Sequence, residues 1–107
     1  MFGNPQRRRT EEVCELRREG GRWLKNQRER RGLSQRELAN LVGSDHYSFI
    51  SQLENGRGRI PPERYEAWSA AFGMADRRFV REILRFYDPI AHRMLFGGEG
   101  QPAASAR

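Results

Sequence analysis

The sequence predicts an all-α fold, a compact bundle of about five core helices with additional helices at both ends. Apolar residues recur at helical spacing along most of the chain, as at Leu38, Leu41 and Val42. Glycines follow several of these stretches, which is where helices commonly end. No stretch alternates apolar and polar residues well enough to predict a strand. A chain of 107 residues has room for one domain with one small core.

Residues 1–9 are polar and contain the run Arg7-Arg8-Arg9, so we expect a flexible basic arm there. We interpret it as a solvated, disordered end, and the alternative is an arm that enters the minor groove of DNA. A helix is expected over 10–20, because Thr10 can cap it and acidic residues follow in its first turn. The pair Gly20-Gly21 is expected to break this helix.

A second helix is expected over about 22–31, and the central pair of helices follows it. Ser34 has the spacing of a capping box with Glu37, which predicts a helix from residue 35 to residue 42. After a turn at Gly43, another helix is expected over 46–55, capped by Ser44 or Asp45.

The C-terminal part of the chain predicts three further helices. Pro62 fits the first turn of one that ends before Gly73. The next extends over about 75–87, and Asp88-Pro89 reads as the cap and first residue of a short last helix. From residue 97 the chain is rich in Gly, Ala and Ser, so we expect a disordered tail.

The formal net charge of +6 favours a polyanionic partner, nucleic acid first and a membrane surface second. No run of apolar residues is long enough to span a membrane, and no secretory signal is visible at the N-terminus. We therefore expect a cytoplasmic, nucleoid-associated protein with no membrane partner. The single cysteine, Cys14, has no partner for an internal disulfide and is expected to be a small apolar residue on a helix.

The two central helices, 35–42 and 46–55, are joined by a short turn. Two short helices joined in this way cross steeply, which is the helix-turn-helix arrangement. Their periodicity leaves a polar face without negative charge on the second helix, and a helix of this size fits the major groove of DNA. The inner faces are expected to bury Leu38, Ala39, Val42, Ile50 and Leu53. The outward positions include Tyr47, Ser48, Ser51, Gln52 and Asn55.

The segment 21–74 resembles the XRE family of DNA-binding regulators, the Cro and phage-repressor type of helix-turn-helix, which is found in bacteria, phages and other mobile elements. This implies a lambda-repressor-like domain at 21–74, with 75–96 as a C-terminal extension. The matching residues are Gly21, Arg28, Gly32-Leu33-Ser34-Gln35, Leu38-Ala39, Gly43 and Ile50-Ser51-Gln52-Leu53-Glu54-Asn55-Gly56.

The resemblance implies a role for each matching position. It implies that Glu54 is structural and pairs with Arg28, and that Gln35 braces the recognition helix while bonding a phosphate. The positions implied to read bases are His46, Tyr47, Ser48, Ser51 and Gln52. The positions implied to contact the phosphate backbone are Gln35, Arg36, Asn55, Arg57 and Arg59.

The sequence departs from the family pattern at two places. The turn is one residue longer, with the extra residue at 44–46, which shifts the register of His46 and Tyr47 by about one position. Phe49 stands where the family has a small or polar residue. We expect it to pack against the rest of the chain; the alternative is contact with a thymine methyl group.

No motif for catalysis, phosphate binding or metal binding is present. His46 and His92 are far apart and have no cluster of carboxylates or cysteines at ligand spacing. We therefore expect no enzyme activity, no catalytic residues, no metal and no cofactor.

The last two helices carry more apolar residues than the core of a small domain needs, which indicates an interface. We expect a homodimer, because regulators of this type bind two half-sites about 34 Å apart. A co-regulator or RNA polymerase is the second candidate partner. The alternative function is a protein-interaction adaptor, including an antitoxin, with weak non-specific DNA binding. The expected interface residues are Phe79, Ile83, Phe86, Tyr87, Ile90 and Met94.

Overall fold

The computed structural model describes residues 5–97, with side chains from residue 9 onwards. Within this range every regular element is a helix, so the predicted all-α fold is confirmed. None of the described helices is both long and apolar enough to cross a lipid bilayer. The elements are α1 (Pro5–Arg30), α2 (Gln35–Leu41), α3 (Tyr47–Glu54), the 3-10 turn η1 (Pro62–Arg64), α4 (Tyr65–Phe72), α5 (Asp76–Tyr87) and α6 (Pro89–Phe96).

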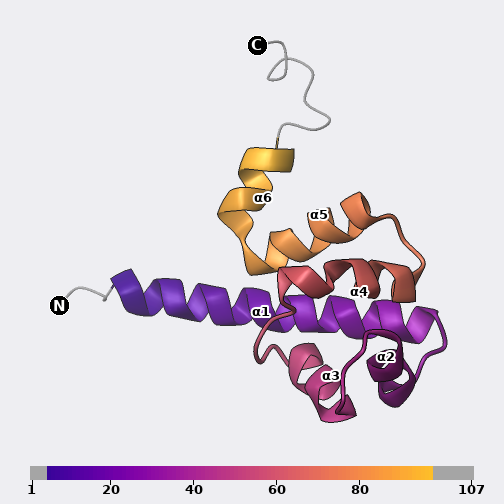
Figure 1. The fold of residues 1–107 in the computed structure, drawn as a ribbon. Helices are drawn as coiled ribbons and strands as arrows, with labels where there is room; N and C mark the ends of the chain where they lie inside the picture. The colour runs from indigo at the N-terminus through magenta and orange to yellow at the C-terminus, as the bar shows by residue number, and fades with distance from the viewer. Residues whose placement is uncertain (1–4, 98–107) are drawn as a thin grey trace, which may run out of the picture.

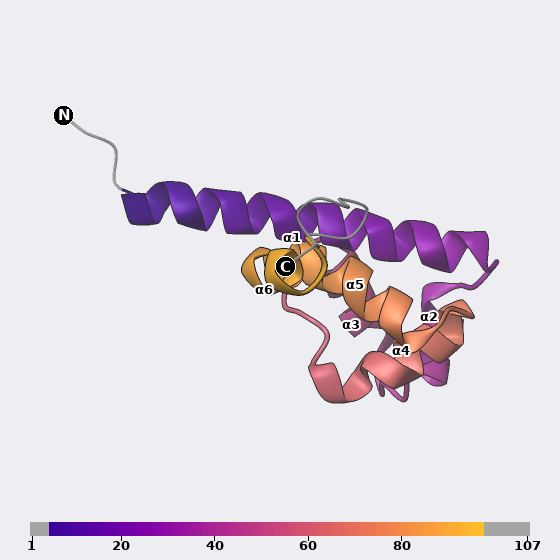
Figure 2. The ribbon, with the colours of Figure 1, turned by 90° about the horizontal axis from the view of Figure 1, so that it is seen from above.

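The long helix α1 organises the molecule (Figure 1). Its C-terminal half packs against α3 on one side and against α5 on another, while α2 contacts α3 and α4. Its N-terminal half projects past the other helices, as the views in Figure 1 and Figure 2 both show. The last helix, α6, rises from the end of α5 and packs on it. The two-helix motif α2–α3 therefore lies across α1 from α5 and α6.

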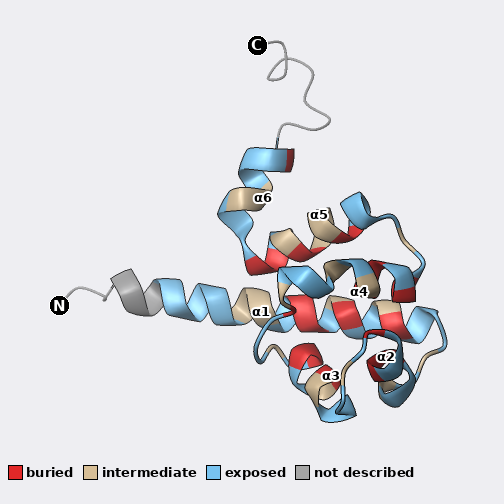
Figure 3. Ribbon diagram, in the orientation of Figure 1, coloured by how far each residue is buried: buried red, intermediate tan, exposed pale blue. Residues whose placement is uncertain are grey.

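The core is continuous from α2 and α3 to α5, and buried positions line the C-terminal half of α1 (Figure 3). Trp23 of α1 contacts Phe72, Phe79 and Phe86, with ring centroids 6.0–6.2 Å apart. Burial of such large rings is the main stabilising contribution in a chain with few apolar residues. The predicted inner faces of α2 and α3 are confirmed, although Leu41 is exposed.

The pair Gly20-Gly21 does not break α1, so the prediction of two separate helices was wrong. Both glycines are buried, because other segments approach them closely. A Cβ on Gly21 would lie 2.3 Å from the backbone oxygen of Glu54, and one on Gly20 would lie 2.8 Å from Cβ of Phe86. The absence of side chains permits this packing, which outweighs a helix-propensity cost of about 1 kcal/mol per glycine.

The predicted flexible arm at 1–9 was wrong for residues 5–9, which belong to α1. Residues 1–4 lie outside the described part of the chain, as does most of the predicted disordered tail, from residue 98. The expected sharp start at Thr10 is absent because the helix continues past it in the N-terminal direction.

The predicted caps have mixed outcomes. Ser34 makes the complete capping box with Glu37, and Asp88 caps α6 through the backbone nitrogen of Ala91. The hydrogen bonds from Ser34 lower the pKa of Glu37. Helix α3 is shorter than predicted, because His46 is its N-cap residue and the Ser44 hydroxyl instead donates to the His46 carbonyl oxygen at 3.1 Å.

Four of the six predicted interface residues are part of the chain's own core: Phe79, Ile83, Phe86 and Tyr87. Their side chains fill the space between α5 and α1. Fewer apolar residues are therefore left over for an interface than the sequence suggested. Ile90 and Met94 are on the surface, 63% and 77% exposed. The expected interface is therefore reduced to these two residues of α6.

Candidate nucleic-acid interface

Helix α3 is held by one face and exposes the other. Ile50 and Leu53 point inward and are buried. His46, Tyr47, Ser48 and Gln52 are exposed, and Ser51 is half-buried. The structure thus brings all five predicted base-reading residues to the exposed side or the N-terminal end of one helix. Their hydroxyl, amide and imidazole groups can donate and accept hydrogen bonds, as base edges in the major groove require.

A buried ion pair ties α3 to α1. The guanidinium of Arg28 donates to both carboxylate oxygens of Glu54, from Nε to Oε2 at 2.7 Å and from Nη2 to Oε1 at 3.1 Å. The hydrogen bond to Glu54 is the largest cause of a raised pKa for Arg28. The pair expected between these residues is confirmed, and its two-pronged geometry fixes the orientation of α3.

Gln35, the first residue of α2, completes this network. Its Nε2 donates to Oε1 of Glu54 at 3.0 Å. The side chain is part-buried and connects α2 to α3, which fits the bracing role expected for it. Arg28 also donates to the carbonyl oxygen of Leu33 at 2.8 Å, so the turn before α2 is held by the same guanidinium. Three helices meet at one carboxylate.

The start of α3 is supported from the side by α2. The guanidinium of Arg36 lies over the ring of Tyr47, 4.9 Å from its centroid. Arginine over an aromatic face is attracted by the ring quadrupole and restricts both side chains. Arg36 and Tyr47 therefore form one exposed unit that includes a predicted phosphate-binding residue and a predicted base-reading residue.

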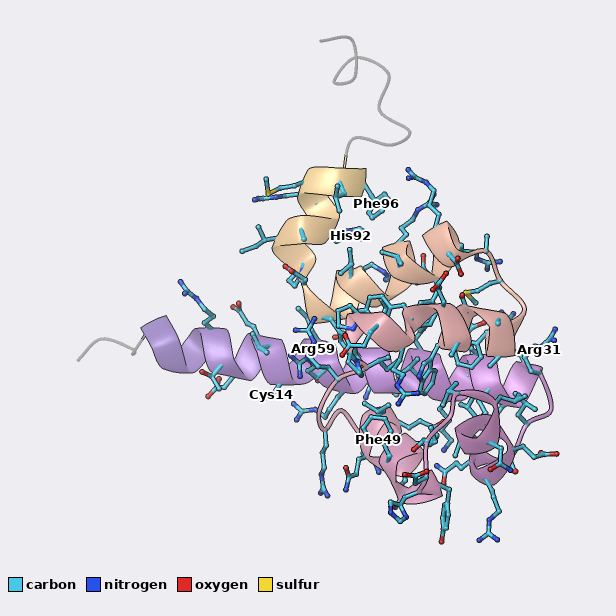
Figure 4. The ribbon with its side chains drawn as sticks, in the orientation of Figure 1. Cys14, Arg31, Phe49, Arg59, His92 and Phe96 are labelled. Atoms are coloured by element: carbon cyan, nitrogen blue, oxygen red, sulfur yellow. The ribbon has the colours of Figure 1, made fainter. Side chains whose placement is uncertain are left out.

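Phe49 points from α3 toward the inside of the molecule (Figure 4). Its side chain is half-buried and packs on the core, so the packing interpretation is confirmed. Together with Val42, Pro61 and Trp68 it lines a cavity of about 210 Å³.

The two arginines that follow α3 differ in position. Arg57 is exposed next to Asn55, which is also exposed. Arg59 lies over the ring of Tyr87, 5.1 Å from its centroid, and Arg17 is 5.3 Å from the same centroid. Figure 4 shows Arg59 beside α1 and the end of α5, away from α3. Arg59 therefore does not join the other predicted phosphate-binding residues.

Two arginines that sequence reasoning missed lie where Arg59 was expected. Arg18 and Arg22 of α1 line a hollow of about 130 Å³ together with Glu54 and Asn55. Their four-residue spacing puts both on one face of a helix, which is a visible signal. The signal was lost because the predicted break at Gly20-Gly21 assigned the two arginines to separate helices.

Within the described residues, no group of three or more His, Cys, Asp or Glu side chains is placed to hold a metal ion. Cys14 is exposed on the projecting half of α1. His92 packs on Phe96, with ring centroids 5.6 Å apart.

A family model described as a helix-turn-helix domain matches residues 21–88, which is more than half of the chain. The chain belongs to this helix-turn-helix family. The family is found in XRE-type regulators, in agreement with the resemblance of the sequence. A comparison with curated proteins finds no match.

Membership of the helix-turn-helix family gives the coarse function. The protein is a DNA-binding regulator of a family that is typically non-enzymatic, and DNA is its partner. The matched range covers both helices of the motif, the buried ion pair between Arg28 and Glu54, and the core up to the end of α5.

Proposed function

We propose that this helix-turn-helix protein is a sequence-specific transcription regulator that acts at the nucleoid and inserts α3 into the major groove of double-stranded DNA. The observation that carries the proposal is the rigid presentation of an exposed polar face. Glu54, at the end of α3, is fixed by Arg28 and Gln35 from two other helices. A reading helix held in this way loses little conformational entropy on binding.

Phosphate contacts on both sides of α3 complete the proposed interface. Gln35 and Arg36 lie in the first turn of α2, while Asn55 and Arg57 follow the last turn of α3. Contacts of this kind fix the register of the protein on DNA and supply much of the affinity, and the bases supply the specificity. Arg59 is left out of this set because it packs on Tyr87.

Replacing Gln52 by alanine is expected to weaken binding to the preferred DNA site by about 1–3 kcal/mol, with little change in non-specific binding. Gln52 is exposed near the centre of the α3 face, so its amide can form two hydrogen bonds with a base. Sites recovered from genomic DNA and titrated with both proteins at about 0.15 M salt provide the measurement. Asn26→Ala, on the exposed surface of α1, is the matched control. Equal loss on all DNA sequences would contradict base reading by Gln52.

The proposed regulator acts as a dimer on an inverted repeat with half-sites about 34 Å apart. Exposed apolar side chains support this, because Ile90, Met94 and Leu95 gather on α6 without cover from the described part of the chain. Replacing both Ile90 and Met94 by glutamate is expected to convert a dimer to a monomer while leaving the thermal midpoint nearly unchanged. Sedimentation measures this, and a monomeric parent protein would contradict the proposal.

An adaptor that binds a protein through the same exposed face of α6 is the second candidate. It is favoured by the distance of α6 from α3, which leaves both surfaces accessible at once (Figure 1). DNA binding measured at increasing salt concentration distinguishes the two functions. A sequence-specific protein still prefers one DNA site as salt rises, whereas an adaptor binds all DNA sequences weakly and alike.

A further inference from the structure

The middle of α1 lies against the C-terminal end of α3, because Gly21 and Gly56 allow the two segments to approach closely. The backbone of Arg18 lies so near Gly56 that a Cβ there would be 2.9 Å from both Cα and N of Arg18. One turn later, Gly21 is in close contact with the Glu54 carbonyl group. The position of Arg18 and Arg22 relative to α3 is therefore set by backbone contacts.

The hollow between these arginines and α3 has a positive character. Glu54 also lines it, but both of its carboxylate oxygens already accept hydrogen bonds from Arg28 or Gln35. The side chains of Arg18 and Arg22 are 54% and 65% exposed. A volume of about 130 Å³ exceeds that of several water molecules at ~30 Å³ each, so a phosphate group has room.

The carboxylate of Glu15 lies near both arginines. Glu15 lies 3.7 Å from Arg18 and 3.9 Å from Arg22. Exposed ion pairs at such distances contribute about 0–1 kcal/mol, so the pairs with Glu15 are weak. They leave the guanidinium groups available to a phosphate. Each guanidinium retains N–H donors that can bind phosphate in the two-pronged manner typical of arginine.

We propose that Arg18 and Arg22 form a phosphate-binding site that clamps the DNA backbone at the C-terminal end of α3. The proposal rests on the proposed function, and it extends the footprint beyond the two-helix motif. Asn55 shares the hollow and Arg57 follows in the chain, so the four residues border one end of the reading helix. The clamp recognises phosphate and carries no sequence information.

The test is the salt dependence of DNA binding by a double variant, Arg18→Gln with Arg22→Gln. Each lost phosphate contact lowers the slope of log affinity against log salt by about 0.9, so the slope should fall by roughly 1.8. At about 0.15 M salt this corresponds to a roughly 30-fold weaker affinity. The loss should be the same for preferred and non-preferred DNA, because only the backbone is contacted.

The matched control is Arg85→Gln with Arg93→Gln, which removes the same charge from exposed positions on α5 and α6. If the slope of log affinity against log salt falls as much for the control as for the test variant, general electrostatic attraction explains the effect. The proposed clamp is then overturned. If the wild-type protein binds no DNA, the proposed function itself fails. Both variants change exposed side chains, so we expect both to fold. Equal unfolding midpoints by circular dichroism would establish that a folding defect does not cause the change in DNA affinity.

A second variant tests the role of Glu15. Glu15→Gln should tighten DNA binding by about two- to fivefold, because Arg18 and Arg22 no longer form ion pairs with a carboxylate. Glu66→Gln on α4 is its control for the change in net charge. Equal effects of the two variants would show that Glu15 does not compete with phosphate at the hollow, and the clamp would be overturned.

Discussion

Replacing Arg28 by alanine is expected to lower the free energy of unfolding by about 3–5 kcal/mol. The variant leaves the Glu54 carboxylate, whose side chain is 4% exposed, with Gln35 as its remaining side-chain donor. An unpaired buried charge costs several kcal/mol because the protein interior solvates it poorly. Denaturant unfolding followed by circular dichroism provides the measurement.

The exposed pair Arg85–Glu82 is the control, because it has a similar length, 2.8 Å, but lies in solvent. Arg85→Ala should change the stability by less than about 1 kcal/mol. A loss for Arg28→Ala as small as that for Arg85→Ala would mean that the network at Glu54 is not needed to fix α3. A variant that is destabilised but folded should also bind DNA less tightly, because the orientation of α3 depends on this pair.

Replacing Gly21 by alanine is expected to destabilise the protein by about 1–3 kcal/mol. In an ordinary exposed helix the same change stabilises by about 1 kcal/mol, so the expected sign is reversed here. The added methyl group would lie 2.3 Å from the Glu54 carbonyl oxygen, which is a backbone atom and cannot rotate away. Thermal unfolding of wild type and variant measures the change.

Asn26→Ala on the exposed side of the same helix is the control, and it should be neutral or slightly stabilising because alanine has the higher helix propensity. A higher unfolding midpoint for Gly21→Ala would indicate that α1 and α3 are farther apart than the structure places them. A lower midpoint for both variants would indicate a general effect on α1.

Features that depend on neighbouring residues could be predicted from the sequence. The capping box of Ser34 and Glu37 and the start of α6 at Pro89 need only a few adjacent residues, and both are confirmed. The buried positions Ile50 and Leu53 follow from helical periodicity. The pair of Arg28 and Glu54 is 26 residues apart, and only the resemblance to a known family indicated it.

Features that depend on contacts between distant segments could not be predicted. The helix continues through Gly21 because of a carbonyl group 33 residues later, and no local pattern contains that information. Arg59 leaves the interface because Tyr87 lies beside it, and Tyr87 itself is in the core. Arg18 and Arg22 were also missed because of contacts between distant segments. Their position beside α3 results from the close approach of α1 at Gly21 and Gly56.

The position of α1 links the two sides of the molecule, because it packs against both α3 and α5. This one helix supplies Trp23 to the aromatic cluster of α4 and α5, and Arg28 to the network that holds α3. Neither side of the molecule keeps a closed interior once α1 detaches. We therefore expect that loss of α1 disrupts the packing of α3 and of the C-terminal helices together. The rigidity with which the protein can present its polar face to DNA is, in this sense, limited by the stability of the whole chain.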